Sequence, residues 1–125
     1  MMRMREVVEN GHKIVIVEAE NQETVINDTQ SALDLMMTVQ YTFQTNRMVI
    51  DKAAVCEKFF ILSTGLAGEI LQKYINYGVK LAIFGDFTHY TSKPLQDFIR
   101  ESNRGKDFFF VSDEQEAVRK LCLAE

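Results

Sequence analysis

The sequence predicts one α/β domain over residues 1–125, built on a mixed, mainly parallel sheet with an N-terminal hairpin and four helices. Asn10-Gly11 stands between two apolar runs, which is the strongest short signal for a hairpin. Apolar segments suited to buried strands then alternate with segments of helical period. The predicted order is β-β-α-β-α-β-α-β-α, and strands separated by helices pair in parallel through crossovers.

The first half of the chain supplies the hairpin, one helix and one strand. The hairpin joins residues 3–8 to residues 12–20, where Ile14 and Ile16 alternate with Val15 and Val17 as in a strand buried on both faces. Asp28 is predicted to cap a helix that starts near Thr29. Residues 48–50 are predicted to be a short buried strand. The helix is expected to bury a stripe of five side chains: Ala32, Leu33, Met36, Met37 and Tyr41.

The second half alternates helix and strand to the end. Ser63 or Thr64 is predicted to cap the next helix, and Gly78 suits its left-handed end. Residues 79–84 and 108–111 are predicted strands. Pro94 suits the first turn of the helix between them, and Ser112, with a glutamine three residues later, predicts a capping box for the last helix. The helix after Thr64 is expected to bury Leu66, Ala67, Ile70, Leu71, Tyr74 and Ile75.

Composition narrows the class of protein. With 125 residues, 46% of them hydrophobic, the chain is long enough for one domain with its own core. A net charge of -4 gives no general attraction to nucleic acid or to an anionic membrane. No apolar run approaches the roughly 20 residues of a membrane span, and the first residues lack the apolar segment of a signal peptide. We therefore expect a cytoplasmic protein without nucleic-acid or membrane partners.

Metal and cofactor motifs are absent from the sequence. Cys56 and Cys122 match no metal-ligand spacing, and two histidines do not complete a site. The chain has no Gly-x-Gly-x-x-Gly sequence, and residues 64–68 lack the lysine and the spacing of a phosphate-binding loop. The sequence therefore predicts no metal and no cofactor.

Three stretches resemble an uncharacterised bacterial family known only as a domain of unknown function. They are TGLAGEILQKYINY at residues 64–77, KLAIFGDF at residues 80–87 and DFIRESNRG at residues 97–105. The resemblance covers most of the chain. It implies no activity.

A more distant resemblance is to STAS domains of the anti-sigma-factor antagonist type. Their marker is a short Asp-Ser-Ser-Gly-Leu-Gly-like stretch that enters a long helix, and the aligned stretch here is LSTGLAG at residues 62–68. The resemblance implies a STAS-like fold and a serine that a partner kinase phosphorylates. That serine falls on Ser63, with Thr64 next to it. Leu62 occupies the position where the family has aspartate.

Ser63, Thr64 and Gly65 form the first candidate site. At a helix start, unpaired backbone N–H groups and the helix dipole favour an anion, so a phosphoserine or a bound phosphate would be well placed. The alternative is an ordinary helix cap followed by a glycine that permits close packing.

Asp86, His89, Arg100 and Arg104 form the second candidate site. Asp86 and His89 follow a predicted buried strand, where an acid–base pair could work near neutral pH. No nucleophile is tied to them in sequence, so no catalytic residue is assigned. The alternative for Asp86 is a turn former that bonds its own backbone. For the two arginines, it is the ordinary preference of cations for a helix C-terminus.

Three hypotheses of function follow. The first is a non-enzymatic STAS-like module that binds a protein partner, under control of phosphorylation at Ser63 or Thr64. The second is a small enzyme or ligand-binding protein, with its site at the carboxyl edge of the sheet near Asp86 and His89. The third is a homodimer that associates through residues 59–62 or the strand at residues 108–110.

Overall fold

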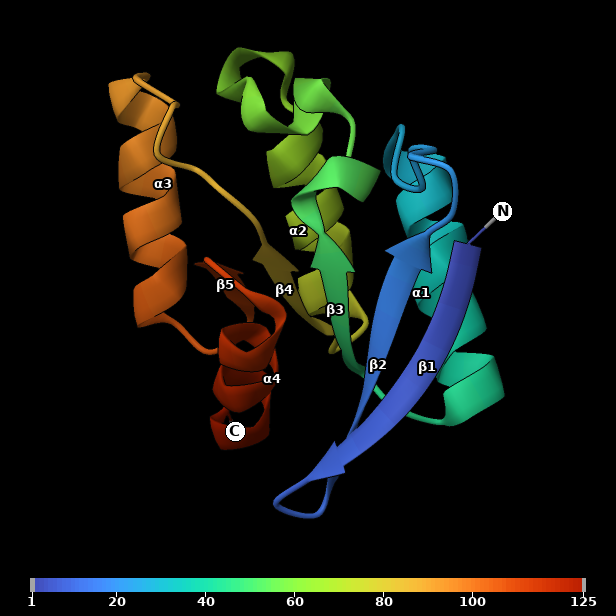
Figure 1. The fold of residues 1–125 in the computed structure, drawn as a ribbon. Coiled ribbons are helices and arrows are strands. Elements are labelled where there is room, and N and C mark those ends of the chain that lie inside the picture. Colours follow the sequence, from blue (N-terminus) through green and yellow to red (C-terminus); the bar gives the residue numbers. More distant parts are fainter. Residues whose placement is uncertain (1, 125) are drawn as a thin grey trace.

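Residues 2–124, which the computed structural model describes, form five strands and four helices in the predicted order (Figure 1). The strands are β1 (Met2–Glu9), β2 (His12–Ala19), β3 (Arg47–Asp51), β4 (Lys80–Phe84) and β5 (Phe108–Val111). The helices are α1 (Thr29–Phe43), α2 (Leu66–Asn76), α3 (Lys93–Arg104) and α4 (Glu114–Leu123). Three short 3-10 turns fill the connection from β3 to α2: η1 (Lys52–Ala54), η2 (Glu57–Phe60) and η3 (Leu62–Thr64).

The hairpin forms at the predicted turn. Glu9 lies opposite His12, and the two residues between them, Asn10 and Gly11, have φ values of 50° and 78°. A two-residue turn of this type needs a positive φ at both positions, which asparagine and glycine accept most readily. The remaining neighbours in the sheet, from β2 to β5, pair in parallel, and the strand order is β1-β2-β3-β4-β5.

The helices cover the two faces of the sheet unequally. The larger core joins α1, α2 and α3 to one face, through strand residues such as Val15, Ile50 and Ile83. The smaller core joins α4 to the other face, through Ile16, Val49 and Phe109. Alternate residues of each strand point to opposite faces, so the continuous apolar strands predicted from the sequence supply both cores.

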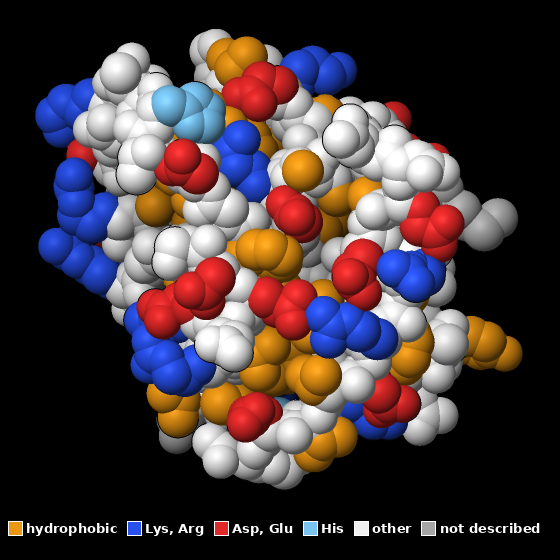
Figure 2. Space-filling model, in the orientation of Figure 1, with side chains coloured by type: hydrophobic (Ala, Val, Ile, Leu, Met, Phe, Trp, Pro, Cys, Tyr) orange, Lys and Arg blue, Asp and Glu red, His pale blue; other side chains and the backbone are white. Residues whose placement is uncertain are grey.

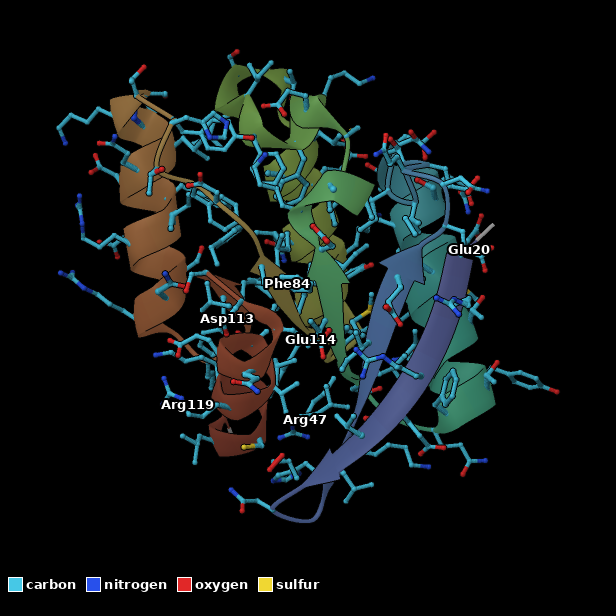
Figure 3. All side chains as sticks on the ribbon, in the orientation of Figure 1. Glu20, Arg47, Phe84, Asp113, Glu114 and Arg119 are labelled. Atoms are coloured by element: carbon cyan, nitrogen blue, oxygen red, sulfur yellow. The ribbon has the colours of Figure 1, made fainter. Side chains whose placement is uncertain are left out.

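Arg47 holds α4 on its face of the sheet. Its guanidinium donates from Nε to the carbonyl of Leu121 at 2.9 Å and from Nη2 to the carbonyl of Ala124 at 2.8 Å. Figure 3 shows Arg47 at the side of β3 that faces α4. Carbonyls at the end of a helix have no partner within the helix, and a cation there is also favoured by the helix dipole.

Helix α1 begins as predicted but buries a different stripe. Asp28 is its N-cap and accepts a hydrogen bond from the backbone N–H of Ser31 at 2.8 Å. Met37 and Tyr41, which were expected in the core, are exposed. The buried side chains of α1 are Ala32, Leu35, Met36 and Val39. The prediction was therefore right for Ala32 and Met36 and wrong for Met37 and Tyr41, while Leu33 is partly buried against the larger core.

Two other details differ from the predictions. The N-cap of α4 is Asp113, which accepts from the backbone N–H of Glu116 at 2.8 Å, and Ser112 lies one residue outside the cap. Ile75 of α2 was expected to be buried and is exposed instead. The other expected apolar positions of α2 are buried or partly buried.

Tyr74 joins α2 to α1 inside the larger core. Its side chain is fully buried, and its hydroxyl donates to the backbone carbonyl of Ala32 at 2.7 Å. Burial raises the pKa of Tyr74 well above its ordinary value of 10.0, because the phenolate would lose its hydration in the core. The folded state therefore strongly favours the neutral form of Tyr74.

Raising the pH above 10 is expected to destabilise the protein through Tyr74. The pKa of Tyr74 is raised in the folded state, so its contribution is fully present below the unfolded pKa and is lost as the pH rises, at about 1 kcal/mol per pH unit. Tyr74→Phe should be about 1 kcal/mol less stable at neutral pH, since it lacks the bond to Ala32, and its stability should fall less steeply in alkali. Urea unfolding from neutral pH to about pH 11 measures both slopes.

The exposed Tyr41 provides the control for this prediction. Tyr41 is 89% exposed. Above pH 10 the free energy of unfolding of Tyr41→Phe should therefore fall with pH as steeply as that of the unmodified protein. Equal alkaline slopes for Tyr74→Phe and Tyr41→Phe would contradict the prediction.

Candidate functional site

The loops at the carboxyl edge of the sheet enclose a groove of about 420 Å³. One wall comes from η2 and η3, which follow β3, and the other comes from the loop between β4 and α3. Both segments lie at the same end of the sheet in Figure 1 because β3 and β4 are parallel. We call this the carboxyl-edge groove. Its lining is Glu57, Phe60, Ile61, Leu62, Ser63, His89, Tyr90, Thr91, Ser92, Pro94 and Leu95.

Aromatic stacking and one hydrogen bond join the two walls. The rings of Phe60 and Tyr90 stack with their centroids 5.5 Å apart, and the hydroxyl of Tyr90 donates to Glu57 Oε2 at 2.8 Å. Lys52 Nζ lies 5.3 Å from the centre of the Phe60 ring and 4.9 Å from that of Tyr90. Partial burial and the bond to the Glu57 carboxylate raise the pKa of Tyr90. These contacts fix the shape of the groove.

Ser63 and Thr91 each contribute an exposed hydroxyl to this site, and Ser63 is the one on the η3 wall. It is exposed in the groove lining, and its side chain makes no hydrogen bond within residues 2–124. Thr64 is used differently: its Oγ1 lies 2.9 Å from the carbonyl of Lys58 and 2.8 Å from that of Ile61, and it accepts from the backbone N–H of Leu66 at 3.2 Å. The hydroxyl of Thr64 thus holds η3 to α2.

The start of α2 differs from the prediction. Gly65, with φ 79°, is its N-cap, and no side chain caps the helix in the usual way. Ser63 and Thr64 belong to η3 instead. A positive φ is easily adopted by glycine, so Gly65 lets the chain turn from η3 into α2. Ser63 therefore lies two residues before the helix cap rather than at it.

Asp86 and His89 line different cavities. Asp86 Oδ1 accepts from the backbone N–H and from the hydroxyl of Thr88, at 2.9 and 2.5 Å. These two bonds lower the pKa of Asp86, with smaller contributions from His89 and Lys52. Asp86 lines a cavity of about 450 Å³ with Thr88, while His89 stacks on Tyr90 and lines the carboxyl-edge groove. The structure thus places His89 and Ser63 in the lining of one groove and gives Asp86 the geometry of a turn former.

Arg100 and Arg104 lie on α3 and join neither cavity. Arg100 Nη1 is 3.0 Å from Asp97 Oδ1, and Arg104 Nη1 is 3.6 Å from Glu101 Oε1. Both pairs join neighbouring turns of one exposed helix, where such pairs contribute a few tenths of a kcal/mol. The two arginines are therefore placed as surface residues of α3.

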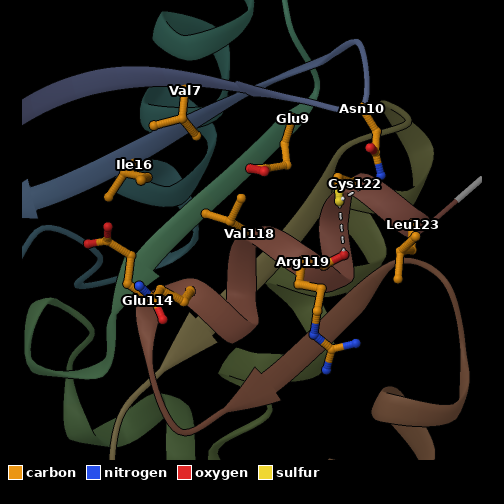
Figure 4. A pocket seen from close by; sticks show the side chains of 10 residues that line it. Val7, Glu9, Asn10, Ile16, Glu114, Val118, Arg119, Cys122 and Leu123 are labelled. Atoms are coloured by element: carbon orange, nitrogen blue, oxygen red, sulfur yellow. Dashed lines mark hydrogen bonds between the residues drawn. The ribbon is translucent and has the colours of Figure 1, made fainter.

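A larger cavity, of about 660 Å³, lies between the hairpin and α4 (Figure 4). We call it the hairpin–α4 groove. Val7, Ile16 and Val118 line its interior, and Figure 4 shows the Glu9 carboxylate directed toward Val118. Figure 2 shows hydrophobic side chains on this face of the molecule, interspersed with charged ones. The sequence gives no signal for this groove, because it arises from α4 covering only part of the sheet.

Cys56 is partly exposed and Cys122 is buried. Cys56 and Cys122 are both free thiols, and Cys122 accepts a long hydrogen bond from Asn10 Nδ2 at 3.6 Å in the hairpin–α4 groove. Within residues 2–124, no group of three or more His, Cys, Asp or Glu side chains is arranged to hold a metal ion. No helix of this part of the chain is long and apolar enough to cross a membrane.

Sequence reasoning missed Glu57 and Tyr90 in the carboxyl-edge groove. Tyr90 follows His89 directly, so an aromatic residue beside a candidate histidine was an available signal. Glu57 had no such signal, because its role depends on the turn η2 bringing it to the Tyr90 hydroxyl.

A family model described as a domain of unknown function (DUF4180) matches residues 9–121. Among curated proteins, none matches the chain.

Proposed function

We propose that this chain, which belongs to the DUF4180 family, is a non-enzymatic, STAS-like module that binds a protein partner at the carboxyl-edge groove. Phosphorylation of Ser63 is the proposed control. The LSTGLAG stretch at residues 62–68 and the order of strands and helices support the STAS-like assignment. The groove supports the partner site, since it combines apolar walls with a few polar groups.

The observation that carries the proposal is the position of Ser63. Its hydroxyl is exposed, makes no hydrogen bond within the described residues, and lies in the lining of the groove. A kinase could approach this hydroxyl without unfolding the chain. Thr64 offers no equal access, because modifying its hydroxyl would remove its contacts with Lys58, Ile61 and Leu66. The proposal therefore selects Ser63 from the two residues that the resemblance suggests.

A phosphate on Ser63 would change the charge of the groove. In the transfer, a bond forms between Ser63 Oγ and the γ-phosphorus of ATP, the bond from that phosphorus to ADP breaks, and the hydroxyl proton is released. The product carries about two negative charges at neutral pH. The groove already contains the Glu57 carboxylate, so a phosphate on Ser63 would have to lose its hydration beside another negative charge when a partner packs on the apolar walls. Phosphorylation is thus expected to release the partner.

Binding is better supported than catalysis at this edge of the sheet. An acid–base mechanism would need Asp86 and His89 to converge on one substrate. The two side chains line different cavities, and both hydrogen bonds to Asp86 come from Thr88. The carboxyl-edge groove contains the hydroxyl of Ser63 and the His89 side chain, and Asp86 is not among its lining residues.

The test is capture of the partner from the native host by the unmodified chain and by Ser63→Asp, with mass spectrometry of the chain isolated from the same cells. We expect a phosphate on Ser63 under some growth conditions. We also expect a partner that binds the unmodified chain at least about tenfold more tightly than Ser63→Asp, a difference of about 1.4 kcal/mol.

Ser112→Asp is the matched control. Ser112 is another exposed serine at the carboxyl edge, and it lies outside the groove. This variant should capture the partner as well as the unmodified chain does. Equal capture by all three chains, together with an unmodified Ser63 under every condition, would reject the proposal.

A further inference from the structure

Strand β1 presents a long free edge. It is eight residues long and lies at the end of the sheet, and no strand of residues 2–124 pairs with its outer side (Figure 1). In a two-residue hairpin the residues that flank the turn bond to each other across it. Glu9 opposite His12 is that pair here. The odd-numbered residues of β1 therefore bond to β2, and the backbone N–H and C=O groups of Met4, Glu6 and Val8 point outward.

We propose that β1 pairs in antiparallel fashion with β1 of a second copy of the chain, across a two-fold axis at Glu6. Exposed edges of this length are templates for a further strand. In this register Glu6 exchanges two backbone hydrogen bonds with Glu6 of the second copy. Met4 then lies opposite Val8, and Arg3 opposite Glu9. Each contact occurs twice, as in any isologous interface.

The charges along β1 are complementary to those of a reversed second copy. The Arg3 side chain is 71% exposed, and its ion-pair contact with Glu20 is long, at 3.7 Å. Glu9 has no ion-pair partner within residues 2–124. The pairing places these two opposite charges on one face of the joined sheet. Each of the two Glu6 side chains that meet at the axis has an ion-pair partner of its own in Lys13, whose Nζ lies 3.4 Å from Glu6 Oε2.

The apolar side chains agree with the same register. Val8 is 65% exposed, and Met4 packs against the larger core. Both lie on the face of β1 that carries α1, because alternate residues share a face. Opposite each other, they would shield Val8 from water. This removes one of the large exposed apolar side chains of the protein.

Neighbouring registers are less favourable. A shift of two residues one way places Arg3 opposite Val7 of the second copy and so leaves the charge of Arg3 without a partner there. A shift the other way moves Arg3 opposite Gly11, beyond the strand, and leaves its charge unmatched. In that second register Glu9 lies opposite Arg5, which is already bound to Glu18 and Glu114 at 3.0 and 2.7 Å. The register centred on Glu6 is therefore the one in which Arg3 of one copy lies opposite Glu9 of the other.

The surfaces that the sequence suggested for self-association are largely buried, and within residues 59–62 only Ile61 and Leu62 keep part of their surface exposed. Phe59 and Phe60 are buried, and so are Phe108, Phe109 and Phe110. The edge of β1 takes their place as the proposed contact. Pairing of two strand edges buries less surface than a standard interface, so we expect a weak dimer with a dissociation constant on the order of 0.1 mM.

Sedimentation equilibrium of the full chain at low salt, up to about 1 mM, tests the proposal. Arg3→Glu places like charges opposite each other twice and should weaken dimerisation about tenfold. The double variant Arg3→Glu with Glu9→Arg restores opposite charges and should return the dissociation constant to within about threefold of the original value. Arg104→Glu, a charge reversal on α3, is the matched control and should leave dimerisation unchanged.

Glu6→Pro tests the backbone pairing itself. The Glu6 N–H points outward, so proline removes a hydrogen bond to the second copy and leaves the bonds between β1 and β2 in place. We expect a folded monomer, checked by circular dichroism. A chain that stays monomeric at about 1 mM and low salt would overturn the proposal. Two other results would assign association to another surface and overturn the proposal as well. One is a dimer that persists in a folded Glu6→Pro variant, and the other is a dissociation constant that stays the same in Arg3→Glu and in the double variant.

Discussion

Replacing Tyr74 by alanine is expected to lower the free energy of unfolding by about 3–5 kcal/mol, the range for a large aromatic side chain removed from a core. Tyr74 is fully buried on α2 and its hydroxyl bonds to Ala32 of α1. The change therefore leaves a cavity and also removes the link between the two helices. Domains of this kind are stable by only about 5–15 kcal/mol, so the variant should approach unfolding at ambient temperature. Urea unfolding followed by circular dichroism measures the loss.

Comparison with Tyr74→Phe separates the two causes. Phenylalanine keeps the ring and loses the hydroxyl, so it should cost about 1 kcal/mol, and the rest of the loss in Tyr74→Ala belongs to the cavity. Tyr77→Ala is the control on the same helix: Tyr77 caps α2 and is exposed, so this change should stay within about 0.5 kcal/mol. Equal losses at Tyr74 and Tyr77 would show that the larger core does not depend on the aromatic ring of α2.

The parts of the fold that were predicted correctly depend on local signals. Asn10-Gly11 fixes the hairpin through the backbone of two residues, and both have the positive φ that the turn requires. The short apolar runs of β3, β4 and β5 are separated by helices and so become parallel neighbours. Each signal lies within a few residues, and no distant contact competes with it.

Helix α1 shows where local signals are insufficient. Its sequence offers two apolar stripes, one through Met37 and Tyr41 and one through Leu35 and Val39, and both share Ala32 and Met36. The choice depends on how the helix crosses the sheet, which is a property of the whole core. The structure buries the second stripe and exposes the first.

The sequence was sufficient to predict that the candidate site lies at the carboxyl edge of the sheet. It was not sufficient to predict which side chains contact each other there. Parallel strands bring the residues that follow them to one edge, and Ser63 and His89 do line one groove there. Asp86 is bonded to Thr88 and His89 lies against the Tyr90 ring, so the two line different cavities although His89 is near enough to help lower the pKa of Asp86. Both depend on side-chain conformations within the loop, which residue spacing does not determine.

Gly85→Ala is expected to destabilise the protein by about 1–3 kcal/mol, the cost of adding a methyl group where the structure has no room. A Cβ at residue 85 would lie 2.7 Å from Lys52 Cβ and 3.2 Å from Lys52 Cδ. The first atom cannot rotate away, because it is fixed to the backbone of η1. Either η1 or the end of β4 must move. Lys52 also lies over the Phe60 and Tyr90 rings, so the same movement should disturb the carboxyl-edge groove.

Three further substitutions identify the cause of this loss. Gly68→Ala adds the same methyl group on α2, where no atom lies within 4 Å, and should stabilise the helix by up to about 1 kcal/mol. Lys52→Gly removes the atom that the new methyl group would meet. In the double variant the part of the Gly85→Ala penalty that comes from the contact should therefore disappear, and the part that comes from the positive φ of residue 85 should remain. In Lys52→Ala with Gly85→Ala the whole penalty should remain, because the Cβ is still present. If Gly85→Ala were as harmless as Gly68→Ala, the β4–η1 contact would have to be looser than 2.7 Å implies. The packing of the end of β4 on η1 would then not be what positions Lys52 over the Phe60 and Tyr90 rings.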